Sequence, residues 1–215
     1  MKRYVKIKPF AIEVVEKKED YNHKTKQVQL NNISEQELIT LLQHESTREK
    51  GFHILVLQYQ ERLYWHIRRI VKTHDDANDV TQNVFIKVYR NIDKFKGNSK
   101  LYTWLYRIAT NESLTFVKKQ QRQATEAFDN PDFNFAERLT ADVHLESNDI
   151  RHILQKAIDQ LPEKQRLVFT MRYFDDLSYQ AISEILGTSQ GGLKASYHHA
   201  AKKIEAFVKG QAMEY

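Results

Sequence analysis

The scarcity of helix-breaking residues is the feature that most limits what this chain can fold into. Its 215 residues include only three prolines and six glycines, and apolar residues recur at helical spacing along most of its length. Proline ends or kinks a helix and glycine weakens one, so a chain with few of either is expected to form long helices. The sequence therefore predicts an all-α fold.

Short-range patterns predict where several of these helices begin. Ser34 followed by Glu37 resembles a capping box, in which two side chains bond to free backbone N–H groups at a helix start. Asp75 or Asp76 is expected to cap a later helix, because an aspartate oxygen can accept from those N–H groups. Pro162 stands where a first-turn proline would open another helix.

Charge is distributed in blocks that divide the chain. Residues 61–119 carry twelve Lys and Arg against six Asp and Glu, whereas residues 121–148 carry two against six. The acidic block is also rich in turn residues around Asn130, which fits a linker better than a core. The expected division is an unassigned N-terminal extension (1–33), a helical domain (34–120), a flexible acidic linker (121–148), a second helical domain (149–209) and a tail (210–215).

The sharpest local signal lies in residues 177–204 and predicts a helix-turn-helix in the second domain. Helical spacing stops at Gly187, which can adopt the left-handed conformation that ends a helix, and Ser189 can cap the next helix. The N-terminal residues of that second helix would enter the major groove of DNA. Its non-apolar face carries Lys194, Ser196, His198, His199, Lys202 and Lys203. An ordinary helical hairpin is the alternative.

A second signal is the alternation of aromatic and basic residues in the segment 92–112. Its aromatic residues are Phe95, Tyr102, Trp104 and Tyr106, interleaved with Lys94, Lys96, Lys100 and Arg107. Such rings can stack on unpaired bases, at about 1–3 kcal/mol per base, while the lysines neutralise phosphate. Trp104 fits a core position equally well, because Ile108 lies one helical turn away. Phe95, expected in a loop beside Gly97, is the better candidate for a base contact.

These segments together resemble a known family. DANDVTQNVFIKVYRNIDKF (76–95) and TWLYRIATN (103–111) are similar to the second region of extracytoplasmic-function sigma factors, a group of the sigma-70 family. LPEKQRLVFTMRYFDDLSYQAISEILGTSQGGLKASYHHA (161–200) is similar to their fourth region. The resemblance implies a subunit that binds core RNA polymerase, directs it to promoter DNA and helps to melt that DNA. It also implies restraint by an anti-sigma factor.

The resemblance implies three sets of site residues. The polymerase-binding set is Asp76, Asp79, Gln82 and Asn83. The set for the minus-ten promoter element is Lys94, Phe95, Lys96, Asn98, Ser99, Lys100, Trp104 and Asn111. The set for the minus-thirty-five element is Ser189, Gly192, Lys194, Ser196, Tyr197 and His199. For the acidic linker the family implies a strand that enters the polymerase channel, whereas composition alone favours a solvated tether.

Two positions of the predicted recognition helix depart from the family pattern, and in the predicted polymerase-binding helix Asn78 and Asn83 stand where the family is often acidic. Gly192 stands where the family usually has threonine, and Ser196 stands where arginine is frequent. One expected contact to a phosphate or a guanine is therefore missing from the predicted recognition helix. Gly191 and Gly192 also weaken the start of that helix, by about 1 kcal/mol each relative to alanine.

Catalysis is not expected from this sequence. The chain has no cysteine, and it lacks the zinc-protease, phosphate-loop and serine-hydrolase motifs. His198 and His199 are adjacent, so on a helix they point about 100 degrees apart and cannot easily share a metal ion. We therefore expect no enzyme activity, no cofactor, no metal and no small-molecule substrate.

Two non-enzymatic alternatives compete with a sigma factor. A conventional helix-turn-helix regulator would bind duplex DNA without polymerase, but it has no need of base-capturing aromatic residues. A protein-binding helical adaptor would not explain a basic recognition face. No apolar run approaches the roughly 20 residues that a membrane helix needs, and the first residues lack the apolar core of a secretory signal. A cytoplasmic protein without membrane insertion is expected.

Overall fold

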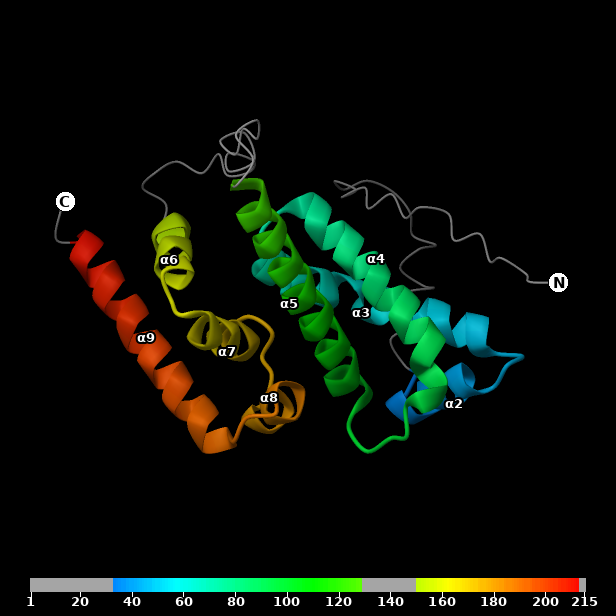
Figure 1. Ribbon diagram of the computed structural model, residues 1–215. Coiled ribbons are helices and arrows are strands. Elements are labelled where there is room, and N and C mark those ends of the chain that lie inside the picture. Colours follow the sequence, from blue (N-terminus) through cyan, green and yellow to red (C-terminus); the bar gives the residue numbers. More distant parts are fainter. Residues whose placement is uncertain (1–32, 129–149, 213–215) are drawn as a thin grey trace, which may run out of the picture. The chain divides into compact units, whose positions relative to one another are not determined.

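The computed structural model describes residues 33–128 and 150–212 (Figure 1). Within these ranges the chain forms α-helices and one short 3-10 helix, and no strand. The elements in chain order are α2 (Glu35–Gln43), α3 (Arg48–Val71), α4 (His74–Asn91), η1 (Ile92–Lys94), α5 (Leu101–Phe128), α6 (Ile150–Asp159), α7 (Glu163–Tyr173), α8 (Tyr179–Leu186) and α9 (Gln190–Ala212). The predicted all-α fold is confirmed.

Helices α2 to α5 pack around a shared apolar core. Helix α3 contacts α2, α4 and α5, and α4 also contacts α5. The most buried core residues are Leu38 and Leu42 of α2, Leu55, Leu63 and Ile67 of α3, Val84 and Val88 of α4, and Leu101 and Leu105 of α5. Within each helix they are separated by whole helical turns, so each helix buries one face. Removal of that apolar surface from water stabilises the group.

The residues at which α2 and α4 begin can be compared with the predicted helix N-caps. Helix α2 begins at Glu35, directly after Ser34, as the capping pattern predicts. Helix α4 begins before the predicted cap, and its N-cap is Thr73, whose hydroxyl accepts a 3.2 Å hydrogen bond from the backbone N–H of Asp76. The prediction that Asp75 or Asp76 caps this helix is therefore wrong. Both lie in the first turn, where their negative charge favours the helix dipole.

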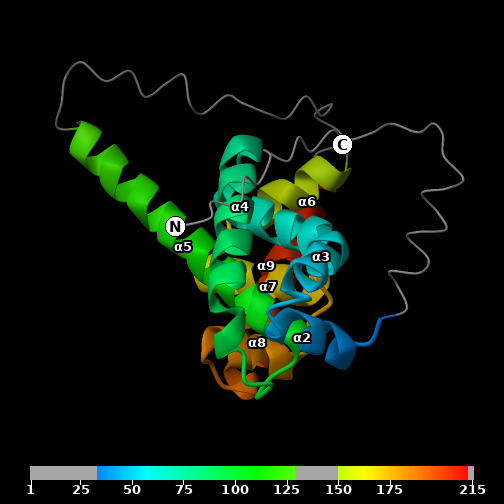
Figure 2. The same ribbon diagram turned by 90° about the vertical axis from the view of Figure 1, so that its right-hand side faces the viewer.

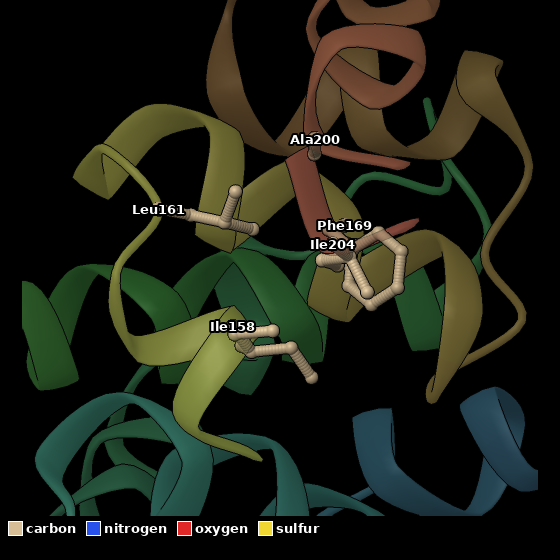
Figure 3. Close-up of a cluster of buried hydrophobic side chains, with 6 residues drawn as sticks. Ile158, Leu161, Phe169, Ala200 and Ile204 are labelled. Atoms are coloured by element: carbon tan, nitrogen blue, oxygen red, sulfur yellow. The ribbon is translucent and has the colours of Figure 1, made fainter. Parts of the chain in front are cut away.

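Helices α6 to α9 form a second group, in which α9 contacts α6, α7 and α8. Figure 3 shows their core, where Ile158, Leu161, Phe169, Ala200 and Ile204 converge. The proline predicted to open a helix lies immediately before α7, at its N-cap, one position earlier than the predicted first turn. The described helices thus pack as two groups, α2 to α5 and α6 to α9, each with its own apolar core.

The segment between the two groups is partly helical. Helix α5 continues to Phe128, past residue 121, where the linker was expected to begin. The remainder of the expected linker, residues 129–148, lies outside the described residues. So do residues 1–32, which are nearly all of the expected extension, and residues 213–215 of the expected tail.

The two groups also contact each other, because residues 35–215 form one compact unit. Helix α8 packs against α5, and α7 packs against α3. Figures 1 and 2 both place α8 beside the first turns of α5. Across residues 33–128 and 150–212, no helix is both long enough and apolar enough to cross a membrane.

Candidate nucleic-acid interface

The turn between α8 and α9 has the predicted helix-turn-helix chemistry. Gly187 adopts a left-handed conformation, with φ 62° and ψ 30°, and its N–H donates to the carbonyl of Ser183. Ser189 caps α9, because its hydroxyl accepts a 3.3 Å hydrogen bond from the N–H of Gly192. Both predictions for this turn are confirmed. Sequence reasoning missed a third device, Ser178, whose hydroxyl caps α8 by accepting from the N–H of Ala181 at 3.1 Å.

The predicted minus-thirty-five residues all lie on the first turns of α9 or at its cap, and they differ in exposure. Ser189, Gly192, Lys194 and His199 are exposed, whereas Ser196 is half-buried. Tyr197 is also half-buried, and its ring stacks on Phe169 with centroids 5.5 Å apart. The exposed members can reach DNA as they stand. Tyr197 contributes at least part of its ring to the core.

The predicted minus-ten residues divide into a buried pair and an exposed set. Phe95 is only 4% exposed and Trp104 only 8%, and their ring centroids lie 5.3 Å apart. Phe95 lies in the predicted loop between η1 and α5, but its ring packs inward on Trp104. Its contact with a base stays a prediction. Neither ring can stack on a base unless it leaves the core.

The exposed set surrounds the turn between η1 and α5. Lys94, Lys96, Asn98, Lys100 and Asn111 are exposed, and Ser99 is half-buried. The aromatic side chain that remains accessible here is Tyr102, which is half-buried, with the ammonium of Lys100 5.9 Å from its ring centroid. The turn thus presents all three lysines of the predicted aromatic–basic segment together with one ring.

Helix α2 holds both ends of this turn. The side-chain amide of Gln43 donates a 3.1 Å hydrogen bond to the carbonyl of Phe95. At the other end, the N–H of Leu101 donates to the carboxylate of Glu35 at 3.1 Å. Sequence reasoning did not identify either residue, because each acts on a partner more than fifty positions away. Both ends of this loop are therefore held by side chains of one helix.

The predicted polymerase-binding residues lie on α4. Asp79, Gln82 and Asn83 are exposed, whereas Asp76 is half-buried and accepts a 3.0 Å hydrogen bond from the side chain of Gln120. Two carboxylates and two amides thus lie within two turns of one helix. Such a surface suits a partner with basic groups. In the described part of the chain, no group of three or more His, Cys, Asp or Glu residues could hold a metal ion.

A basic loop, a helix-turn-helix and an acidic helix face define a helical DNA-binding protein of the transcription machinery. Comparison with known families supports this class. Residues 55–123 match sigma-70 region 2, and residues 151–204 match sigma-70 region 4. The first range covers most of α3, all of α4, the loop and most of α5, and the second covers nearly all of α6, all of α7 and α8, and α9 as far as Ile204.

Curated relatives identify the group within that family. The chain is 33% identical over 165 residues to the ECF RNA polymerase sigma-E factor of Escherichia coli K12, covering 73% of this chain and 86% of the relative. It is 32% identical over 181 residues to the sigma-E factor of Haemophilus influenzae, covering 80% and 94%. The chain belongs to the extracytoplasmic-function sigma factors of the sigma-70 family. It is therefore a subunit that directs RNA polymerase to promoters.

Solved structures support the fold. The sigma factor RpoE, in complex with the anti-sigma factor NepR from Bartonella quintana, superposes with a TM-score of 0.60 at 23% identity, covering 74% of this chain and 98% of that one. CnrH, in complex with the cytosolic domain of CnrY, superposes with a TM-score of 0.58 at 20% identity, covering 80% and 96%.

Proposed function

We propose that three surfaces of this sigma factor divide the work of initiation. The face of α4 that contains Asp76 and Asp79 binds core RNA polymerase. The loop from Lys94 to Lys100, with Asn111, contacts the minus-ten element. The start of α9, from Ser189 to His199, contacts the minus-thirty-five element. The observation that carries this proposal is that one helical group exposes carboxylates on α4 and lysines on the adjoining loop.

Promoter opening by this loop needs no bond cleavage. Unstacking a base costs a few kcal/mol, and stacking of a base on an aromatic ring returns about 1–3 kcal/mol. Phe95 and Trp104 are buried, so we assign the stacking contact to the half-buried ring of Tyr102. The exposed amide of Asn98 can bond to base edges, and the flanking lysines attract the phosphates.

We propose that this sigma factor acts by binding polymerase and DNA and catalyses no reaction itself. Its proposed location is the cytoplasm. Its membership in a family of transcription initiation factors supports this assignment. We also propose that an anti-sigma factor restrains it. One structural relative, RpoE, is described in complex with the anti-sigma factor NepR, and another, CnrH, in complex with the cytosolic domain of CnrY.

Reconstitution tests the whole proposal. Purified protein is added to sigma-free core polymerase with genomic DNA from the source organism, and the 5′ ends of the transcripts are sequenced. We expect starts at a small set of sites that share two upstream elements. Transcription no more specific than that of core polymerase alone would contradict the proposal, and a conventional duplex-binding regulator would give that result.

Paired variants separate the surfaces. Asp79→Lys should weaken binding to core polymerase, with Glu61→Lys as the control, because Glu61 is exposed on α3 and lies outside the proposed α4 face. Lys96→Ala should leave polymerase binding unchanged and reduce open-complex formation, with Lys50→Ala as an exposed control. Equal losses in both assays for Asp79→Lys and Lys96→Ala would contradict the division of roles.

A further inference from the structure

The contact between the two helical groups centres on a buried carboxylate. Asp175, just after α7, is only 6% exposed. Its Oδ2 lies 2.6 Å from Nδ1 of His66 on α3, and its Oδ1 accepts a 3.1 Å hydrogen bond from Nη1 of Arg69. Both oxygens of one region 4 side chain therefore bond to region 2.

On α3, His66 also contacts a side chain of α5. The hydroxyl of Thr110 donates a 2.7 Å hydrogen bond to the carbonyl of Tyr106. The same hydroxyl oxygen lies within hydrogen-bond distance of Nε2 of His66, at 3.0 Å. The Asp175 carboxylate and the Thr110 hydroxyl thus contact the two ring nitrogens of His66. Burial lowers the pKa of the Arg69 guanidinium, an effect that the Asp175 carboxylate opposes. Asp175 thus lies between His66, which also contacts Thr110 of α5, and Arg69.

Further contacts surround this ion pair. The Arg69 guanidinium lies 4.5 Å from the ring centroid of Phe174, a cation–π geometry. Lys72, at the end of α3, pairs with Asp159, at the end of α6. The second pair is about 40% exposed on each side, with 41% for Lys72 and 44% for Asp159, and exposed pairs contribute little. The buried Asp175 contact is therefore the one that decides whether the groups stay together.

The same arrangement places α8 beside the proposed minus-ten loop. A cleft of about 410 Å³ is lined on the loop side by Asn98, Lys100 and Tyr102, and on the other side by Ser178, Gln180 and Glu184 of the α8 end. The α8 side offers a carboxylate and no cation. A DNA strand is a polyanion, so it would meet both a steric block and a like charge at this position.

We infer that Asp175, His66 and Arg69 form an autoinhibitory latch. It holds region 4 against α3 and α5 and thereby keeps α8 over the loop that would contact the minus-ten strand. The polymerase-binding residues Asp79, Gln82 and Asn83 and the exposed start of α9 stay accessible in this closed form. The consequence for promoter binding rests on the proposed function, whereas the closed form itself is a property of the free chain.

Separation of the two helical groups would expose all three side chains of the latch to water at the same time. A buried charge that loses its only partner is strongly destabilised, but opening the interface hydrates the carboxylate, the imidazole and the guanidinium at once. Variants that remove charge from one side should therefore shift the balance toward the open form. A single hydrogen-bonded charge typically accounts for about a tenfold change in such a balance, equivalent to about 1.4 kcal/mol.

Energy transfer within the free chain tests the latch. The chain has no cysteine, so Glu49→Cys and Ala206→Cys, both at exposed positions, carry a donor and an acceptor dye. Asp175→Asn should raise the ratio of open to closed molecules about tenfold and lower the transfer efficiency. Asp176→Asn is the matched control, because the Asp176 side chain is 91% exposed. Arg69→Gln removes the charge on the region 2 side of the latch and should also favour the open form. It replaces Asp175→Asn in the measurement if that variant does not fold.

A functional measurement shows whether the latch inhibits. The opened variants should bind a fluorescent single-stranded minus-ten oligonucleotide more tightly than the unaltered chain, whereas Asp176→Asn should not. Unchanged energy transfer in both Asp175→Asn and Arg69→Gln would overturn the latch, whatever the polymerase assays give. Lower transfer without tighter oligonucleotide binding would overturn inhibition while leaving the proposed function to its own reconstitution test.

Discussion

The helix-turn-helix and the turn before α5 are both built around a left-handed glycine, yet their predictability differs. At the α8–α9 turn, Gly187 and Ser189 take the conformation and the bond that their residue types favour. At the η1–α5 turn, Gly97 is also left-handed, with φ 71°. Two of the aromatic residues near it, Phe95 and Trp104, are however buried, which their residue types and spacing did not indicate.

The difference separates two kinds of information in a sequence. Helix caps depend on residues within about four positions of each other, so residue type and spacing determine them. The direction of an aromatic ring depends on what packs against it, and that partner can be far away along the chain. The carbonyl of Phe95 is held by Gln43, 52 positions earlier. Local chemistry predicts the turns, and long-range packing decides which rings are exposed.

The largest expected effect comes from Phe95→Ala. If this ring is a core residue, removing it should lower the free energy of unfolding by about 3–5 kcal/mol, the usual cost of deleting a buried phenylalanine. Denaturant unfolding followed by circular dichroism measures the change. A ring that serves only DNA binding would give a far smaller loss.

Lys96→Ala, at the next position, is the matched control for that measurement. Lys96 is exposed, and exposed substitutions usually change stability by less than about 0.5 kcal/mol. Comparable destabilisation by Lys96→Ala and Phe95→Ala would mean that the whole turn is a structural element and would remove the contrast between its buried and exposed residues.

Much of the architecture could be predicted from the sequence, but the site only in part. Helical spacing predicts the fold class, and turn chemistry predicts the helix-turn-helix. The cap of α4 was assigned to the wrong residue because Thr73 precedes two aspartates that are equally good caps. Nothing local predicts that Asp175 is buried by a histidine 109 positions away. The close packing at Gly51 of α3 could not be predicted for the same reason. A Cβ at this position would lie 3.0 Å from the backbone of Leu41 in α2.

A second prediction concerns Tyr106, another ring of the aromatic–basic segment. It is 1% exposed, and burial, followed by the Asp175 carboxylate, raises its pKa from 10.0 to about 12. Because the folded-state pKa is raised, this contribution to stability is fully present below pH 10 and is lost as the pH rises to about 12. The loss over that window should be about 2–3 kcal/mol.

Tyr106→Phe isolates that contribution. The variant has no phenol to ionise, so its unfolding free energy should decline less between pH 10 and 12 than that of the unaltered chain. The difference between the two pH profiles is the quantity to compare, because lysines titrate in both proteins. Parallel profiles would indicate that the phenol reaches water, and the inward packing of this segment would then need revision.

The glycines of the helix-turn-helix give a smaller effect with opposite signs. Gly187→Ala should destabilise the protein by about 1–2 kcal/mol, since a side chain disfavours the left-handed conformation. Gly191→Ala should stabilise it by up to about 1 kcal/mol, because Gly191 lies within a helix where alanine is preferred. No atom lies within 4 Å of a Cβ at either position, so thermal unfolding of the pair compares backbone conformation alone. Shifts of the same sign would refute the local account of this turn.

The smallest effect is expected from the two serine caps, and it tests whether stability and DNA contact are separable at this turn. Ser178→Ala and Ser189→Ala each remove one cap bond and should each cost about 1 kcal/mol. Only Ser189 belongs to the proposed minus-thirty-five surface, so Ser189→Ala should also weaken binding to duplex promoter DNA, as measured by fluorescence anisotropy. If both variants lose stability equally and neither loses affinity, Ser189 acts as a cap alone. The DNA contacts of this helix would then begin further along, at Lys194.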